Sequence, residues 1–420
     1  MASLEYHPLA RSNRFTSGVC TSTFCATDRA KLTSMGKLDP PRRLLMGSGP
    51  SNAEARVLRA MALPPLPSDH PECAALLDDL TCDLRKLFCA SSAIALVVPG
   101  ASRSGIEAIL NSLVEPGDRV LVAVYGHFGE LLCTLASRHG ADVERIDAEW
   151  GHIVDPAAVS VALRKTRPKL VAVVHADTST GMLQPLDEIG RACRDTGSLL
   201  VVDAVLSIGG CEVNVDVWGL DAVVGGMQKC LGGPPGLAPL VYSTRAAEAM
   251  AARTTPAYSR YLDLRRLHEA WQRPGESEMA TPMLYALREA LRRVDDEGSS
   301  ARWQRHAQAA ASLRAGLQAM GLELFGDRRH AVPMITLVRV PDGVDEAALR
   351  SQILDEHGVE IMAAFGPLRG KVWRIGTMGT NATLASVLQV LAALEAVLSR
   401  RGLSLPRGAG VDAALAARSS

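Results

Sequence analysis

Short apolar runs alternate with segments of helical periodicity through the middle of the chain. Strand-like runs occupy residues 93–99, 119–124, 169–175, 198–203 and 221–224. They are apolar on both faces, as expected for strands buried in a parallel sheet. The intervening segments carry apolar residues at helical spacing. This alternation predicts a doubly wound α/β domain with a mixed or parallel sheet, whose ligands bind at the carboxyl ends of the strands.

The pattern of apolar residues changes on both sides of this region. Residues 1–42 are polar and interrupted by proline and glycine, which is typical of an irregular arm. Beyond about residue 255 the chain becomes rich in Arg, Ala and Glu, with helical stretches at 283–320 and 384–399 and a strand-like run at 334–340. We predict a large domain at 43–285, a smaller α+β domain at 286–400 and a frayed tail at 401–420.

The composition excludes several classes of protein. The 420 residues include 45 basic and 45 acidic side chains, so no net field attracts nucleic acid or an anionic membrane. No apolar run approaches the roughly 18 residues of a membrane span. The N-terminus lacks the apolar core of a secretory signal. The nine cysteines are scattered without close metal-ligand pairs, which favours reduced thiols. We therefore predict a cytoplasmic protein without a metal site.

One lysine lies where an amine would lose its solvation. The chain has only seven lysines among its 45 basic residues, and six of them occupy charged or arm-like segments. Lys229 instead follows a predicted buried strand, in the sequence GGMQKCLGGPPG at 225–236. Glycines on both sides let the backbone approach a flat cofactor, and desolvation favours the nucleophilic amine. We predict that Lys229 forms a Schiff base with a cofactor; a lysine that reaches for solvent is the alternative.

Asp203 is a second candidate for binding the cofactor. It ends the apolar run at 199–202, which directs its carboxylate into the crevice at the carboxyl end of a strand. An enzyme that uses pyridoxal phosphate (PLP) needs an acid beside the pyridine nitrogen, because a protonated ring is the better electron sink. Lys229 follows 26 residues later, about one crossover and one strand. The pair favours a PLP site over the alternative, a helix-capping Asp.

Further candidates follow the predicted strands. The sequence GASRSG at 100–105 would open a helix, whose amides and positive dipole end favour a phosphate. We expect Ala101, Ser102 and Arg103 there, with Gln228 as an added neutral donor. Phe128 is a candidate to stack on the pyridine ring, although a core aromatic is equally consistent. Thr178 is a candidate to hydrogen-bond the phenolic oxygen of the cofactor.

Arg374 is the candidate for binding a substrate carboxylate. It lies in the sequence KVWRIGTMG at 371–379, within an apolar strand. A guanidinium there is costly unless paired, and its planar fork fits a carboxylate with two hydrogen bonds. In an enzyme of amino acids that carboxylate belongs to the substrate. A structural salt bridge is the alternative.

Taken together, these segments resemble a known family. From about residue 43 to about residue 397 the chain is similar to the class V aminotransferases of PLP fold type I, in the alanine/serine–glyoxylate group. The matching segments are RLLMGSGP, EPGD, DTSTGMLQPL, VVDAV, GMQKCLGGPPG and KVWRIGTMG. Within the group, GASRSGIEA, YGHFG and FGPLRGKVWRIGTMG resemble the ureidoglycine–glyoxylate aminotransferases of purine catabolism most.

The resemblance implies roles for individual residues and a homodimer with shared active sites. It assigns Lys229 to the cofactor, Asp203 to the pyridine nitrogen and Arg374 to the substrate carboxylate. The remaining implied cofactor contacts are Phe128, Thr178, Val205 and Gln228, and Ser48 in RLLMGSGP is an expected substrate contact. The implied reaction is transamination of a small amino donor with glyoxylate as the acceptor.

Two departures from the ureidoglycine pattern leave the donor open. Where those enzymes carry Asn in Ser-Asn-Tyr-Phe-Asp, this chain has Arg260 in SRYLD at 259–263. The segment 275–282, expected to reach the phosphate of a neighbouring subunit, is short and acidic, with Thr281 as its candidate hydroxyl. Ureidoglycine is the first expected donor, and alanine or serine is the alternative. A PLP-dependent lyase and a non-catalytic binding protein on the same fold are the further alternatives.

Overall fold

A seven-stranded mixed sheet forms the centre of the larger part of the molecule. The computed structural model describes residues 39–276 and 278–418. In sheet order the strands are Ile94–Gly100 (β2), Gly236–Tyr242 (β10), Ala222–Val224 (β9), Leu199–Asp203 (β8), Leu170–Val174 (β5), Arg119–Val124 (β3) and Asp142–Asp147 (β4). β10 runs antiparallel to both neighbours, and every other neighbouring pair is parallel. The predicted α/β fold with a mixed sheet is confirmed.

The burial of the strands explains their apolar sequences. Every residue of β5 and β8 is buried, so both faces of these strands are covered. The edge strand β4, with the sequence DVERID, exposes charged side chains instead, which disfavours pairing with another chain. The accompanying helices are Ala55–Met61 (α2), Pro71–Leu87 (α3), Ser102–Leu113 (α4), His127–Arg138 (α5), Pro156–Thr166 (α6), Asp187–Thr196 (α7), Val215–Trp218 (α8), Thr244–Ala251 (α9), Leu264–Gln272 (α10) and Thr281–Glu297 (α11).

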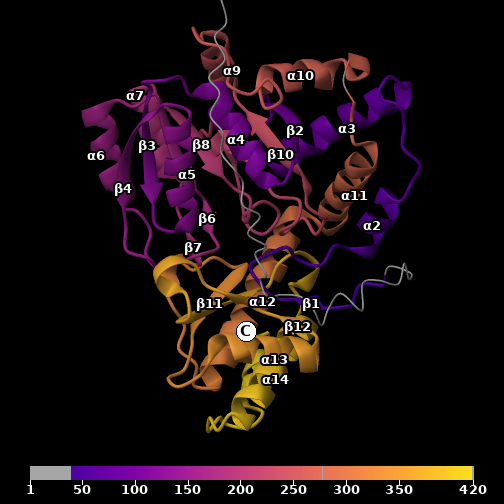
Figure 1. The fold of residues 1–420 in the computed structure, drawn as a ribbon, viewed down its shortest axis with the longest axis vertical. Helices are drawn as coiled ribbons and strands as arrows, with labels where there is room; N and C mark the ends of the chain where they lie inside the picture. Colours follow the sequence, from indigo (N-terminus) through magenta and orange to yellow (C-terminus); the bar gives the residue numbers. More distant parts are fainter. Residues whose placement is uncertain (1–38, 277, 419–420) are drawn as a thin grey trace, which may run out of the picture. The chain divides into compact units, whose positions relative to one another are not determined.

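A smaller antiparallel sheet and four helices form the C-terminal part, drawn in orange to yellow in Figure 1. The sheet holds Ile335–Arg339 (β11), Val372–Gly376 (β14) and Met362–Ala363 (β13), in that order. The helices are Ser299–Ala319 (α12), Glu346–His357 (α13), Leu384–Arg400 (α14) and Ala409–Ala416 (α15). Two further strand pairs join Leu44–Leu45 (β1) to Val359–Glu360 (β12) and Ala176–Asp177 (β6) to Met182–Leu183 (β7).

The segment at 44–54 connects the two sheets. β1 pairs with β12, and the amide of Gly376 donates to the carbonyl of Met46 at 2.8 Å. A few residues further on, the amide of Ser51 donates to the carbonyl of Gln228 at 2.9 Å, and the amide of Glu54 donates to the carbonyl of Gly232 at 2.9 Å. One short segment therefore holds β14 and the loop that follows β9.

Two details differ from the sequence-based prediction. Helix α11 continues to Glu297, and Val294 packs in the apolar core of the large sheet. We therefore propose that the smaller domain begins at Gly298 rather than at 286. Within the tail that the sequence predicts to fray, residues 409–416 form α15 with Ala414 fully buried, so we propose that this part packs on the smaller domain. A Cβ at Gly316 of α12 would lie 2.7 Å from the carbonyl oxygen of Gly410, so small residues allow this close approach.

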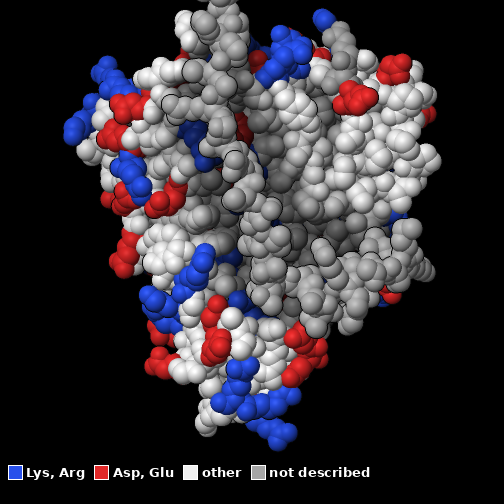
Figure 2. Space-filling view, viewed as in Figure 1, with Lys and Arg blue, Asp and Glu red and all other residues white. Residues whose placement is uncertain are grey.

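Figure 2 shows charged side chains of both signs next to one another along the left side and the bottom of this face, in keeping with the balanced composition. Among the described residues, no helix combines the length and the apolar character that crossing a membrane requires. Of the predicted arm at 1–42, residues 1–38 lie outside the described part of the chain.

Candidate active site

The carboxyl ends of β2, β5, β8 and β9 converge on a cavity of about 390 Å³. All the predicted site residues except Arg260 and Thr281 line it. They are Ser48, Ala101, Ser102, Arg103, Phe128, Thr178, Asp203, Val205, Gln228, Lys229 and Arg374. Segments far apart in the sequence thus meet at the edge of the sheet where the strand order predicts a ligand.

Lys229 lies in the loop after β9 with its amine in the cavity. Its Nζ donates a hydrogen bond to the carbonyl oxygen of Ser48. Desolvation by the surrounding protein, and next the positive charge of Arg374, lower the pKa of Lys229 to about 8. A lowered pKa leaves more of the amine uncharged near neutral pH, which is the form that attacks a carbonyl carbon.

Two glycines make room for this lysine and for its neighbours. At Gly49 the backbone φ is +106°, and a Cβ there would lie 2.2 Å from Nζ of Lys229. At Gly226 a Cβ would lie 2.6 Å from the carbonyl oxygen of Val205. A side chain at either position would displace the groups that line the cavity, so only glycine fits.

Asp203 is a buried carboxylate at the end of β8, with 7% of the residue exposed. Burial raises its pKa to about 6, and the charge of Asp177 adds to that shift. Its Oδ1 accepts a hydrogen bond from the amide of Val205 at 2.9 Å. No α-helix begins at this point, since α8 starts only at Val215, so Asp203 is not the N-cap of a helix. A buried anion of this kind suits a ligand that brings a positive charge.

The N-terminus of α4 forms one end of the cavity. Its N-cap, Ala101, has no side chain that could accept from the first-turn amides. The hydroxyl of Ser102 donates to Oε1 of Gln228 at 3.0 Å, which occupies the acceptor end of this amide, so a ligand in the cavity would meet its NH₂ donor. Arg103 adds an exposed guanidinium at the rim. Hydroxyl, amide and cationic donors at a helix N-terminus fit a phosphate group.

Arg374 emerges from the middle of β14 and is only 3% exposed. Its Nε donates to the carbonyl of Ala363 at 2.8 Å and its Nη1 to the carbonyl of Thr178 at 3.3 Å. Its Cζ lies 4.2 Å from the centre of the Phe365 ring. Burial lowers its pKa to about 10, which leaves it charged at neutral pH. No carboxylate of the described residues forms an ion pair with it, so the salt-bridge alternative lacks a partner and a substrate carboxylate can take that place.

Sequence reasoning missed two groups in this site. The ring of Phe365 stacks on Arg374. Phe365 lies in the segment FGPLRG, shortly before the strand that carries Arg374, and this closeness in sequence is the signal that could have indicated it. Asp177 is fully buried and accepts hydrogen bonds from the amide and hydroxyl of Ser179 and from the amide of Phe128. It therefore orients the turn that carries Phe128.

Arg260 and Thr281 lie outside the cavity of their own chain. Arg260 is exposed, and the loop around it is fixed by two hydrogen bonds between Ser259 and Asn111 of α4. The hydroxyl of Thr281 is buried and exchanges hydrogen bonds with the backbone of Leu66. Within one chain neither residue can contact a ligand in the cavity, and their roles across a subunit interface stay predictions.

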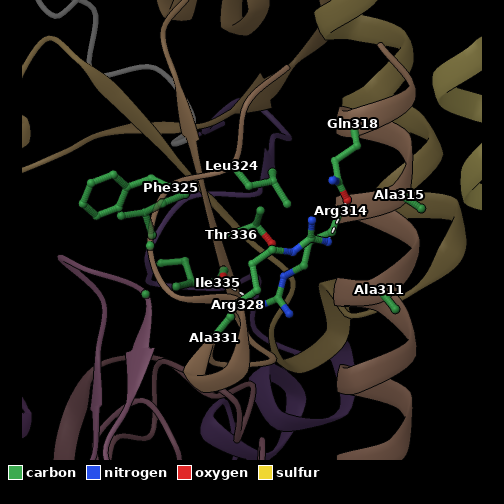
Figure 3. A pocket seen from close by; sticks show the side chains of 13 residues that line it. Ala311, Arg314, Ala315, Gln318, Leu324, Phe325, Arg328, Ala331, Ile335 and Thr336 are labelled. Carbon is green, nitrogen blue, oxygen red and sulfur yellow. Dashed lines mark hydrogen bonds between the residues drawn. The ribbon is translucent and has the colours of Figure 1, made fainter. Parts of the chain in front are cut away.

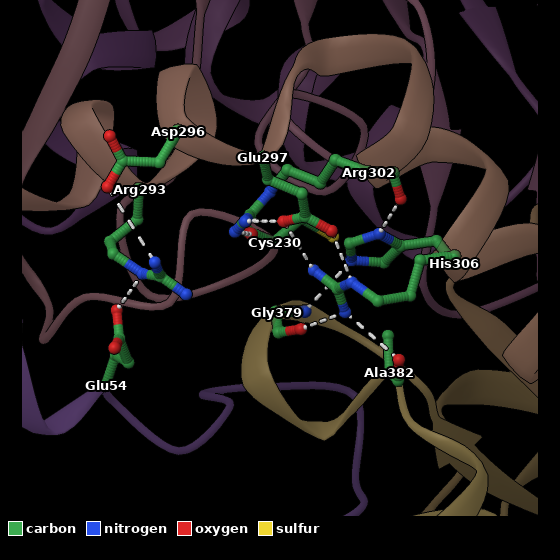
Figure 4. A network of polar contacts seen from close by, with 10 residues as sticks. Glu54, Cys230, Arg293, Asp296, Glu297, Arg302, His306, Gly379 and Ala382 are labelled. Carbon is green, nitrogen blue, oxygen red and sulfur yellow. Dashed lines mark hydrogen bonds and ion pairs between the residues drawn. The ribbon is translucent and has the colours of Figure 1, made fainter.

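A buried polar network fixes the loop of Lys229 from the side of α12 (Figure 4). Arg302 donates to the carbonyl of Cys230 at 2.6 Å and to the carboxylate of Glu297 at 2.7 Å. His306 accepts from the amide of Gly379 at 3.0 Å and donates through Nδ1 to the carbonyl of Arg302 at 2.8 Å. Burial lowers the pKa of His306 to about 3, so the ring stays neutral and keeps this arrangement.

The residues present fit PLP. Phe128 and Val205 line the cavity and would offer surfaces to a flat ring, and the buried carboxylate of Asp203 would suit a cationic ring nitrogen. The donors at the start of α4 suit the phosphate, and Lys229 has the lowered pKa of an amine that binds an aldehyde.

Comparisons with known proteins agree with this assignment. Residues 70–370 match the sequence profile of the class V aminotransferases. The chain is 43% identical over 399 residues to (S)-ureidoglycine–glyoxylate transaminase of Bacillus subtilis (strain 168), which covers 90% of this chain and 96% of that protein. It is 36% identical over 369 residues to alanine–glyoxylate aminotransferase of Drosophila melanogaster, covering 86% of this chain and 94% of that protein. The crystal structure of ureidoglycine-glyoxylate aminotransferase from B. subtilis superposes with a TM-score of 0.90 at 45% identity, covering 92% of this chain and 100% of that one.

Proposed function

Because the chain belongs to the class V aminotransferase family, a family of PLP-dependent transaminases, we propose that it transfers the amino group of (S)-ureidoglycine to glyoxylate. The observation that carries the proposal is the 43% identity to a ureidoglycine–glyoxylate transaminase along almost the whole of both chains. The acceptor glyoxylate is shared by the names of both groups of relatives. This activity would place the enzyme in purine catabolism.

In the proposed reaction each residue of the cavity has a separate role. PLP, when bound, withdraws electrons from the α-carbon of the amino donor and so acidifies its proton. Lys229 would hold the cofactor, release it to the donor amine, and then remove the proton from the α-carbon. Asp203 would keep a positive charge on the ring nitrogen, with Phe128 and Val205 against the ring. The start of α4 and Gln228 would hold the phosphate, and Thr178 the phenolic oxygen.

Arg374 would bind the carboxylate that donor and acceptor share. We expect Arg374→Gln to raise the KM of both glyoxylate and the amino donor about ten- to a hundredfold, because a hydrogen-bonded charge pair is lost from a buried site. Initial rates over a range of both substrates measure this effect. Arg339→Gln, on the adjacent strand β11 and paired with Glu323 at the surface, is the control and should leave both constants unchanged. Unchanged KM values in Arg374→Gln would show that Arg374 does not bind the substrate carboxylate.

We also propose a homodimer in which each chain completes the active site of the other. Tyr258 and Tyr261, on either side of Arg260, are 80% and 66% exposed in the single chain. Exposed aromatic residues close together support a contact with another protein. The seven cysteines among the described residues are unpaired, which supports a reducing compartment such as the cytoplasm.

The donor is tested by a panel of ureidoglycine, alanine and serine, each with glyoxylate. Alanine is the second candidate, because the alanine–glyoxylate aminotransferases match at 36% identity and Arg260 replaces the expected neutral amide. We expect kcat/KM to be highest with ureidoglycine. A higher kcat/KM with alanine or serine would overturn the proposed donor while leaving glyoxylate as the acceptor.

The same panel tests Arg260. Because arginine offers donors only, it cannot supply the acceptor of an amide. We expect Arg260→Asn to change the ratio of kcat/KM for ureidoglycine to that for alanine at least about tenfold. Arg266→Asn, an exposed residue of α10, is the matched control. An unchanged ratio in Arg260→Asn would show that Arg260 lies outside the assembled site.

A further inference from the structure

A second cavity, of about 310 Å³, lies between α12 and the strand β11 (Figure 3). Its polar lining consists of Arg314 and Gln318 from α12, Arg328 from the loop before β11, and Thr336 from β11 itself. The rest of the wall is formed mostly by small and apolar side chains. Among the residues that the structure describes, no aspartate or glutamate lines it.

Arg314 brings a positive charge into this cavity without an acidic partner. Its Nη2 donates to the carbonyls of Val332 and Ile335, and the described residues offer no acceptor to its Nε or Nη1. Burial, and next the charge of Arg328, lower the pKa of Arg314 to about 10. The guanidinium is therefore still charged at neutral pH, desolvated, and repelled by a second cation nearby.

Arg328 is that second cation. Its Nη2 donates to the neutral Oε1 of Gln318 at 2.9 Å, and no described carboxylate forms an ion pair with it. Figure 3 shows the side chains of Arg314 and Arg328 turned into the same space. Acidic residues are present in this region but pair elsewhere, because Asp327 binds Arg329 and Glu323 binds Arg339. Two arginines at one cavity thus have no counter-charge from the described chain.

Thr336 adds an independent sign of a missing partner. The residue is 3% exposed, it lines the cavity, and its hydroxyl has no hydrogen-bond partner among the described residues. A buried hydroxyl without a partner lowers stability, so native proteins rarely leave one. A ligand oxygen in the cavity would complete the hydrogen bonding of both the hydroxyl and the guanidinium groups.

We propose that this cavity is a second anion site, which takes a small dianion such as a dicarboxylate or a phosphate. Two negative charges match the two arginines, oxygen acceptors match their donors and the hydroxyl of Thr336, and the volume suits a small molecule. The site is separate from the catalytic cavity. Of the described segments, the two cavities share only the turn between β6 and β7, since Thr178 lines the catalytic cavity and Gly181 lines this one.

Titration calorimetry on the cofactor-loaded, full-length protein tests the proposal, in a phosphate-free buffer of low ionic strength. Succinate and inorganic phosphate are the probes, and succinamide is the uncharged control. We expect saturable binding of one or both anions and none of succinamide. Arg328→Gln and Arg314→Gln should each weaken binding at least about tenfold, and Thr336→Val a few-fold. A response to only one probe identifies the ligand as a dicarboxylate or as a phosphate.

Matched variants decide where the anions bind. Arg329→Gln removes a neighbouring arginine that is already paired with Asp327, so it should leave the affinity unchanged. Arg314→Gln also loses bonds to two carbonyls and could unfold, whereas Arg328 is exposed and its replacement keeps the test decisive. The proposal is overturned if neither anion binds, or if Arg328→Gln and Arg329→Gln weaken binding equally. It is also overturned if binding is lost in Arg374→Gln but kept in Arg328→Gln, because the anion then occupies the catalytic cavity.

Discussion

Lys229→Ala should lower kcat by about five to six orders of magnitude, on the scale known for the loss of a catalytic nucleophile. The reason is that one amine would hold the cofactor and carry the α-proton, and no other described lysine lines the cavity. Steady-state rates with glyoxylate and the best donor measure the loss. Borohydride treatment of the wild type should fix the cofactor on Lys229, as mass spectrometry of the digested protein would show.

The control for this variant is Lys371→Ala. Lys371 is exposed, lies just before β14 and does not line the cavity, so its replacement should leave kcat unchanged. More than about a hundredth of the wild-type rate in Lys229→Ala, or the label on another lysine, would contradict the assignment.

Asp203→Asn should lower kcat roughly a thousandfold, because about 4 kcal/mol of charge stabilisation at the ring nitrogen is lost. The neutral amide keeps the size of the side chain but not its charge. Asp195→Asn, an exposed position on α7, is the control and should keep full activity. Wild-type turnover in Asp203→Asn would show that the carboxylate serves only the local turn to Val205.

The same substitution should stabilise the cofactor-free protein. The carboxyl of Asp203 has an ordinary pKa of 3.8 and a pKa of about 6 in the folded chain. Because the pKa is higher in the folded chain, protonation of Asp203 stabilises the folded protein. This contribution to the free energy of unfolding is fully present below pH 4. It is lost as the pH rises through about 6. At pH 7 the free energy of unfolding of the wild type should therefore be about 3 kcal/mol lower than that of Asp203→Asn, whose side chain stays neutral.

Urea unfolding of the cofactor-free proteins at pH 4 and at pH 7 measures this difference. The two proteins should unfold at similar urea concentrations at pH 4, and Asp203→Asn should be the more stable at pH 7. A variant that is less stable than the wild type at pH 7 would show that the buried carboxylate has a stabilising partner.

The centre of the fold could be predicted from the sequence because its strands carry a strong signal. β5 and β8 are apolar on both faces, so their positions agree with the predicted runs to within one residue at each end. The site prediction uses the same logic, since Asp203 ends one predicted strand and Lys229 lies in the loop after another. Polar residues at such ends must face either solvent or a ligand, and the parallel arrangement brings them together.

The remaining features depend on contacts that no local pattern reveals. The edge strand β4 is polar because it is exposed, so it lacks the apolar signal of the central strands. The small residues of α15 predicted fraying, but its stability comes from packing against Gly316, which lies about 90 residues earlier. Only the resemblance predicts Arg260 and Thr281 at the site, and within one chain neither lines the cavity.

The segment at 44–54 has a consequence for how the protein is made. β1 pairs with β12, and Met46 accepts a hydrogen bond from Gly376, so the segment at 44–54 awaits partners that are made more than 300 residues later. At about 5–20 residues per second, a ribosome needs on the order of tens of seconds to supply them. During that interval the large sheet can assemble, but Arg374 and the strand that aligns it do not yet exist. A strand that emerges well after the large sheet therefore completes the active site, and a nascent chain that stops short of β14 should remain inactive however well its sheet has folded.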